Sequence, residues 1–248
     1  KDPLQSFLDQ IEQSGLGRPH IQGTGEIERF DTPDCKKGEK AGWAVLYLDR
    51  DFSAGAWGSW RNGGNHSWAS SHAPEAILKM QEGQAKAETA RIAGYEEARL
   101  KAQKIWDQLS EAKPDHPYLL SKGVKPFGIR QRGNNLVIPM NGIDGMLYSF
   151  QDINPDGIKK NFPGGEAKGH FHIIQGNKDP TYLVEGYATG ATVHEATGNQ
   201  VVVTFSCGNL VEVAKSFPGT TIAADNDWET KGNPGVASAK KTGLHFIF

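Results

Sequence analysis

The stretch TYLVEGYATGATVHEATGNQVVVTFSCGNLVEVAKSFPGTTIAADND, residues 181–227, carries the clearest structural pattern of the chain. Short apolar runs typical of buried strands alternate in it with segments whose composition and glycine ends are typical of helices. The alternation continues to Phe248. It predicts a parallel sheet with right-handed crossovers, so we expect an α/β domain over residues 180–248.

Three carboxylates stand where the predicted strands end. Glu185 closes the first strand, and Asp225 and Asp227 follow the third. If these strands are neighbours, as in a 2-1-3-4 order, the acids converge at the edge where open α/β sheets bind ligands. Hard oxygen donors favour Mg²⁺ or Mn²⁺, and Gly186 lets the backbone approach a ligand closely. The pattern predicts a metal site that also holds phosphates, as in polymerases and nucleases.

Upstream of this domain the residue pattern changes repeatedly. Residues 1–72 predict one short helix and a small antiparallel sheet, and residues 73–112 predict a long connecting helix. Residues 113–179 mix helical and strand patterns around a hairpin at Gly142 and Gly145. The expected fold class is therefore α+β, with a small N-terminal β-rich unit and a C-terminal α/β subdomain.

Several side chains have a structural interpretation. Four of the six tryptophans lie between positions 43 and 68, and we expect them in the core of the small sheet rather than on a face that stacks nucleobases. His170 and His172 are expected on one exposed face of a strand. Ile92 is expected on the apolar face of the long helix.

Composition limits the classes of protein. The chain has 248 residues, enough for roughly two domains, and its 37% hydrophobic and 23% charged residues exclude disorder throughout. A net charge of −2 excludes binding of nucleic acid by bulk positive charge. No apolar run approaches the ~20 residues of a membrane helix, so we expect no membrane partner. Cys35 and Cys207 form no CxxC motif, so we expect no zinc and a cytoplasmic protein.

The segments YLVEGYATGAT, CGNL and AADND together closely resemble the Toprim domain, in particular that of DNA primases from phages and conjugative plasmids. Upstream, HPYLLSKGV and the run from LVIPM to KKNFPGG resemble the N-terminal half of the RNA polymerase domain of these primases. The resemblance covers about residues 114–248 and implies a Rossmann-like Toprim subdomain over residues 180–248. Residues 20–70 are similar to the segment that precedes this core in mobile-element proteins. Replicative primases of bacteria carry a zinc ribbon there, whereas this chain has only Cys35.

The resemblance also implies roles for individual residues. Glu185 would act in catalysis by orienting the reacting hydroxyl or a metal ion, and Asp225 and Asp227 would hold divalent ions, two in all. Four cations match positions that bind template or incoming nucleotide: Arg130, Arg132, Lys159 and Lys160. Of these we expect Lys160 and Arg132 to contribute most. Such groups, across a cleft from metal-binding acids, would hold phosphates.

These expectations point to a DNA primase catalytic core, which makes short RNA primers on single-stranded DNA from ribonucleoside triphosphates by metal-dependent nucleotidyl transfer. Two alternatives stay open: a Toprim-type nuclease, and a non-catalytic module that binds single-stranded DNA. A replicative helicase, fused or separate, is the protein partner that the resemblance suggests. Because residues 244–248 read as an uncovered edge strand, we expect the parent chain to continue past Phe248 and the Toprim subdomain to be truncated.

Overall fold

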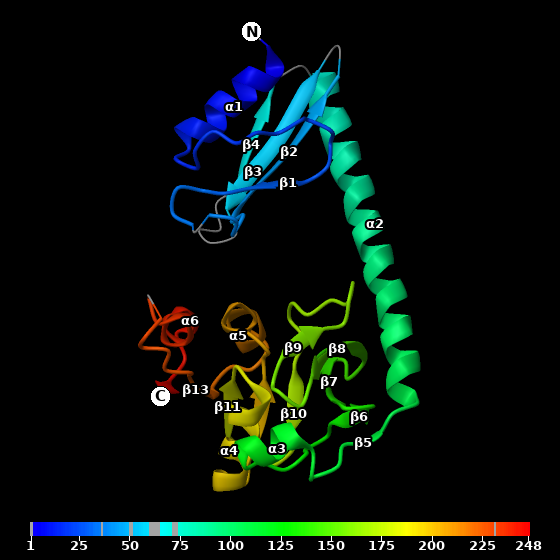
Figure 1. Ribbon diagram of the computed structural model, residues 1–248, viewed down its shortest axis with the longest axis vertical. Coiled ribbons are helices and arrows are strands. Elements are labelled where there is room, and N and C mark those ends of the chain that lie inside the picture. Colours follow the sequence, from blue (N-terminus) through cyan, green and yellow to red (C-terminus); the bar gives the residue numbers. More distant parts are fainter. Residues whose placement is uncertain (1, 36, 50–51, 60–64, 71–73, 231) are drawn as a thin grey trace. The chain divides into compact units, whose positions relative to one another are not determined.

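The computed structural model describes residues 2–35, 37–49, 52–59, 65–70, 74–230 and 232–248. The chain divides into two compact units, Lys1–Thr89 and Ala90–Phe248 (Figure 1). The described residues form three sheets, one of which contains parallel strands, together with helices. The expected mixed α+β class is therefore confirmed.

The first unit opens with helix α1, Pro3–Gln13. The Asp2 carboxylate accepts a hydrogen bond of 3.0 Å from the Leu4 amide, and Pro3 occupies the first turn, where an amide hydrogen has no partner within the helix. The predicted short helix is confirmed, and three of its apolar side chains, Phe7, Leu8 and Ile11, are buried. The same short segment thus carries both the cap and the apolar spacing.

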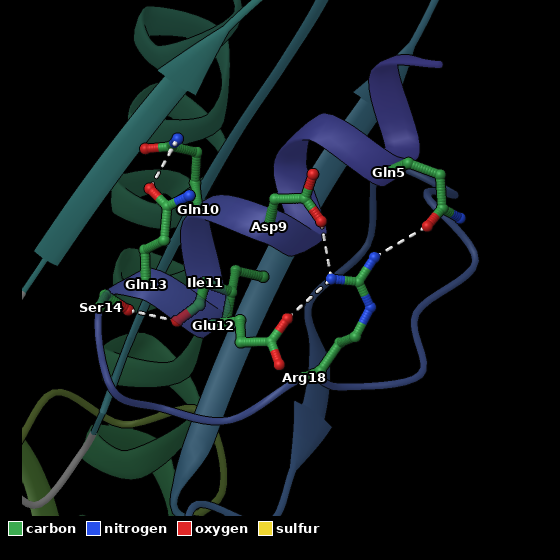
Figure 2. A network of polar contacts seen from close by, with 8 residues as sticks. All are labelled: Gln5, Asp9, Gln10, Ile11, Glu12, Gln13, Ser14 and Arg18. Atoms are coloured by element: carbon green, nitrogen blue, oxygen red, sulfur yellow. Dashed lines mark hydrogen bonds and ion pairs between the residues drawn. The ribbon is translucent and has the colours of Figure 1, made fainter. Parts of the chain in front are cut away.

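Arg18 connects the polar face of α1 to the loop that follows it. Its guanidinium group donates hydrogen bonds of 2.7–2.9 Å to three side chains of the helix, Gln5, Asp9 and Glu12 (Figure 2). Ser14, just after the helix, accepts a hydrogen bond of 3.0 Å from the Trp57 indole N–H. Because exposed ion pairs contribute little to stability, we assign this network to fixing the path of the loop.

Four antiparallel strands follow, in the order β1-β2-β3-β4. They span Glu28–Phe30, Gly42–Leu48, Ser53–Ser59 and Asn65–Ala69. Helix α1 packs against β2 and β3 (Figure 1). Phe7 lies so close to Gly55 that any side chain at that position would overlap its ring. The predicted small antiparallel sheet is confirmed.

Two tryptophans of this unit have the core role expected of them. Trp57 is 3% exposed, and Trp68 packs against the same cluster. Phe7 meets Trp57 edge to face, with ring centroids 5.3 Å apart. Trp43 is half-buried, and Trp60 lies outside the described residues. The structural interpretation therefore holds for Trp57 and Trp68.

The predicted long helix is α2, Pro74–Asp107, which continues from the first unit into the second. Ala98 and Ala102 are buried in the second unit, whereas Ile92 is 56% exposed. The expectation for Ile92 is therefore wrong, because residues 88–94 are all exposed and, from residue 88 onward, the first buried residue of the helix is Ala98. No helix among the described residues is long and apolar enough to cross a lipid bilayer.

The second unit contains an antiparallel sheet with the strand order β5-β6-β7-β8-β9. The strands span Ser110–Glu111, Arg130–Arg132, Asn135–Asn141, Leu147–Ile153 and Lys159–Asn161. Helix α3, Pro117–Lys122, lies between β5 and β6 in the chain. The predicted hairpin is confirmed, because β7 and β8 pair and Gly145 in their turn has a φ of 78°, which favours glycine.

The other sheet of this unit has the order β10-β12-β11-β13-β14. Its strands, from β10 to β14, span His172–Ile174, Asn177–Val184, Asn199–Val203, Thr221–Ala223 and Phe246–Ile247. Helices α4, α5 and α6 span Tyr187–Thr197, Cys207–Ala214 and Pro234–Thr242. The predicted alternation is confirmed, and β11 and β13 are parallel neighbours. The edge strand β10 pairs antiparallel with β12.

The two sheets of the second unit are joined. Asn141 and Phe171 form an antiparallel bridge, in which the N–H of each donates to the carbonyl oxygen of the other at 2.7 and 3.0 Å. One buried cluster includes Leu136 and Ile153 from the first sheet and Val184 from the second. The sheets therefore share a core.

The histidines on either side of Phe171 are buried, so the expectation of an exposed face is wrong. His172 is 3% exposed, its Nε2 lies 2.8 Å from the Phe127 carbonyl oxygen, and burial lowers its pKa to about 4. His170 stacks on Tyr148 with ring centroids 4.1 Å apart, and burial lowers its pKa too. Both histidines lie at the junction of the two sheets, which the local alternation of residues does not reveal.

Candidate active site

The sheet brings two of the predicted acids to one edge. Val184 of β11 pairs with Ala223 of β13 in parallel register, so Glu185 and Asp225 leave their strands at the same end. The Thr189 hydroxyl, in the first turn of α4, donates a hydrogen bond of 3.4 Å to Asp225 Oδ1. The carboxyl ends of adjacent parallel strands thus form the candidate site, as expected for open α/β sheets.

The carboxylates of this edge affect each other electrostatically. The pKa of Glu185 is raised, first by burial and then by the charges of Asp225 and Asp227. The pKa of Asp225 is raised by burial and by Asp227. The positive charge of Lys159 acts in the opposite direction on both groups. Proximity of like charges in a half-buried position disfavours the ionised form, which identifies a place where a cation would be stabilising.

The donor set fits a divalent ion chemically. Glu185, Asp225 and Asp227 offer hard carboxylate oxygens, which Mg²⁺ and Mn²⁺ prefer, and a cation would relieve their mutual repulsion. Within the described ranges, no three His, Cys, Asp or Glu side chains already form a metal-binding group.

Asn233 organises the segment that carries Asp227. Its side-chain nitrogen donates a hydrogen bond of 2.8 Å to Asn226 Oδ1, and its Oδ1 accepts one of 3.1 Å from the Asp227 amide. The side chain of Asn226 is thus directed to Asn233. Gly235, at the start of α6, packs so tightly that a Cβ would overlap the Asp225 carbonyl oxygen.

Of the four predicted cations, Lys159 is the one that faces the acids. In the β8–β9 pairing it stands opposite Ile153, whose side chain belongs to the core shared with Val184. Its Nζ lies 3.5 Å from the position that a Cβ would occupy at Gly186. Lys159 and Gly186 therefore meet beside Glu185, as two predicted site residues.

Lys160 is on the opposite face of the same sheet. It stands opposite Asp152, and because side chains alternate along a strand, it shares a face with Arg130 and Arg132. That face carries Val137, which is buried in one cluster with Ala102 of α2. The four cations therefore form no single track.

The two arginines on that face are engaged in contacts within the fold. Arg130 donates a hydrogen bond to the Trp106 carbonyl oxygen, and its guanidinium carbon lies 4.5 Å from the centre of the Trp106 ring. Arg132 forms an ion pair with Asp152. Arg130 thereby attaches β6 to the end of α2, and Arg132 attaches β6 to β8. In the structure, both charges stabilise contacts within the fold.

Sequence reasoning missed three residues that shape this edge. Thr189 contacts Asp225, and Asn233 fixes the segment after β13. Asn209, which is 9% exposed, donates hydrogen bonds to the carbonyl oxygens of His170 and Thr204, at 2.9 and 2.8 Å. Thr189 and Asn209 lie within the segments YLVEGYATGAT and CGNL, which carry the Toprim resemblance, but the resemblance gave them no role. Asn233 precedes Pro234, a pattern that indicates a helix start rather than a site.

Comparison with known proteins shows that the chain is similar to plasmid-type DNA primases. The chain is 33% identical over 269 residues to DNA primase TraC from Escherichia coli, covering 96% of this chain and 25% of the relative. A second DNA primase TraC from Escherichia coli is 30% identical over 281 residues, covering 99% of this chain and 19% of the relative. The chain thus spans about a quarter or less of these relatives. No protein-family model matches it.

A solved structure shows a weaker likeness. It is that of bacteriophage T7 lagging-strand DNA polymerase interacting with primase domains of two gp4 subunits bound to an RNA/DNA hybrid and dTTP. The TM-score is 0.39 at 12% identity, covering 52% of this chain and 78% of the matched chain. The resemblance to DNA primases that the sequence predicts is confirmed by the two relatives.

Proposed function

We propose that this relative of DNA primases is itself a primase catalytic core, which makes short RNA primers on single-stranded DNA by metal-dependent nucleotidyl transfer. The observation that carries the proposal is the position of Glu185 and Asp225 at the carboxyl ends of neighbouring parallel strands, with Asp227 close enough to raise the pKa of both. We interpret residues 180–248 as a Toprim subdomain on this basis. A replicative helicase is the proposed protein partner.

The carboxylates would divide the work at this edge. Asp225 and Asp227 would hold Mg²⁺ or Mn²⁺, and Glu185 would orient the reacting hydroxyl or an ion. When bound, the ions would supply positive charge to the attacking and leaving oxygens. Burial and the neighbouring acids raise the pKa of Glu185, and the charge of a bound cation would act in the opposite direction.

The phosphates of the nucleotide would lie against Lys159 and the start of α4. Gly186 is the residue before α4, and no side chain caps the first amides of this helix. Amides at the start of a helix are donors that suit an anion such as phosphate. A Cβ at this position would lie 3.5 Å from the Lys159 ammonium nitrogen, so the start of α4 and the lysine are close neighbours. The absence of a side chain at Gly186 would let the backbone approach a phosphate closely.

Substituting the two adjacent lysines separately tests this placement. Lys159→Met is expected to weaken Mn²⁺-dependent binding of a ribonucleoside triphosphate by about 10-fold, because one charge-assisted contact with phosphate is lost. Lys160→Met removes the same charge from the other face and is expected to change the affinity less than about 2-fold. Isothermal titration calorimetry measures both. Equal losses of nucleotide affinity in the two variants would contradict the placement of the phosphates on the Lys159 face of the sheet.

The primase proposal is tested by the products that the chain makes. We expect incubation with single-stranded DNA, Mn²⁺ or Mg²⁺ and labelled ribonucleotides to yield short RNA oligomers that depend on the DNA. Shortened DNA without RNA products would support the nuclease instead. DNA binding without either product would support a binding module and overturn the proposal.

A further inference from the structure

A tryptophan follows the acids directly and is exposed. Trp228 stands one residue after Asp227, and 75% of its surface is accessible to solvent. Its side chain forms no hydrogen bond or ring contact with the residues that the structure describes. An indole is a large, mainly apolar ring that proteins usually bury. Because this one is exposed, packing in the core does not explain its presence here.

The backbone places Trp228 at the tip of a turn. The Thr230 amide donates a hydrogen bond of 2.8 Å to the Asp227 carbonyl oxygen, which closes a turn with Trp228 and Glu229 at its two central positions. Such positions are ordinarily occupied by glycine, proline or small polar residues. Local turn chemistry therefore does not explain a tryptophan either.

The turn is attached at its base to the acid edge. Asn233 donates to Asn226 and accepts from the Asp227 amide, so the turn and the carboxylates are held by one side chain. Trp228 directly follows Asp227 and is three residues after Asp225 in the sequence, so a group bound by these acids would lie next to the turn that carries the indole. The neighbouring acids indicate what that group is, because divalent ions held by such carboxylates also bind phosphates.

We propose that Trp228 is a nucleobase-stacking residue, whose indole packs against the base of a nucleotide whose phosphates lie at the acid edge. The inference rests on the proposed function and adds a contact for the base. Stacking suits an indole because every base has an aromatic face, so the contact would bind any nucleotide without distinguishing one base from another. The base belongs either to the incoming triphosphate or to the DNA strand, and the chemistry is the same.

Ligands with and without a base separate this contact from the rest of the site. Trp228→Ala is expected to weaken Mn²⁺-dependent binding of ATP by about 5- to 100-fold and to leave binding of inorganic triphosphate unchanged. Trp228→Phe, which keeps an aromatic ring, is expected to retain most of the affinity for ATP. Ile143→Ala, at another side chain that is 73% exposed, is the matched control and should change neither.

A second arm identifies the source of the base. If Trp228 stacks on the DNA strand, Trp228→Ala weakens binding of a single-stranded oligonucleotide but not of an abasic strand of equal length, and ATP binding is unaffected. If neither ATP nor the oligonucleotide binds more weakly to Trp228→Ala than to the wild type, the inference is wrong while the primase proposal stands. Failure of the wild type to bind ATP, triphosphate or DNA would overturn both.

Discussion

Asp225→Asn is expected to lower the rate of primer synthesis by at least about 10³-fold, because under the proposed function it removes a charged metal ligand from a group that acts as a unit. The substitution is nearly isosteric, and the amide oxygen can still accept the hydrogen bond from Thr189. Incorporation of labelled ribonucleotide on single-stranded DNA measures the loss. Calorimetry with Mn²⁺ and a triphosphate should show that the affinity for the metal-bound nucleotide falls as well. Activity within about 10-fold of the wild type would remove Asp225 from the site.

The same substitution is expected to stabilise the metal-free protein at pH 7. The pKa of Asp225 is raised in the fold, so the folded chain binds this proton more tightly than the unfolded chain does. The stabilising contribution is complete below the pKa of the unfolded chain, about 4, and is lost as the pH rises through the raised value. The amide side chain of the variant carries no charge at any of these pH values.

Thermal unfolding between pH 4 and 7 provides the measurement. Without metal, the advantage of the Asp225→Asn variant over the wild type should grow as the pH rises through the raised pKa, and Mn²⁺ should stabilise the wild type more than the variant. A variant that is less stable than the wild type at pH 7 without metal would show that repulsion among the carboxylates is not significant.

Gly235→Ala is expected to reduce primer synthesis by about 10²-fold or more. The new Cβ would overlap the Asp225 carbonyl oxygen, so either the start of α6 or the segment that carries Asp225 must move. A displacement of about 1 Å at a reacting group costs about 10²-fold in rate, and overpacking costs about 1–3 kcal/mol of stability. The primer assay and urea unfolding measure the two effects.

A glycine in open surroundings supplies the control. Gly94 lies within α2, and no atom would come within 4 Å of a Cβ at this position. Gly94→Ala should therefore keep the activity and raise the stability by up to about 1 kcal/mol, because alanine favours helix. If Gly235→Ala behaves like Gly94→Ala, the packing of α6 does not set the position of Asp225.

The acid edge could be anticipated because it depends on coarse features of the sequence. Apolar runs separated by helical segments are enough to indicate a parallel sheet, and the ends of its strands are visible in the sequence as Glu185 and Asp225. The neighbourhood of β11 and β13 then brings these residues to one edge. Neither step requires knowledge of a side-chain contact.

The positions of the cations could not be anticipated, because they depend on register. Lys159 and Lys160 are adjacent, so a shift of one residue in β9 would exchange which of them faces Glu185. The expectation that favoured Lys160 had no means of fixing that register. Ile92 shows the same limit in a helix, since the 3.6-residue period marks a face but not where along the helix a partner surface begins.

The bridge between Asn141 and Phe171, with the core that both sheets share, has a consequence for ion selectivity. Lys159 belongs to one sheet and Glu185 and Asp225 follow strands of the other, and because interiors are close-packed the shared core holds the backbones of the two sheets in a fixed relation. The turn from Asp227 to Thr230 is exposed and lies outside that core, so it is the part of the proposed site that could adjust to an ion. Mg²⁺ tolerates little departure from octahedral geometry. The stiffness of that turn would thus determine how strictly the protein discriminates between Mg²⁺ and larger, more permissive divalent ions.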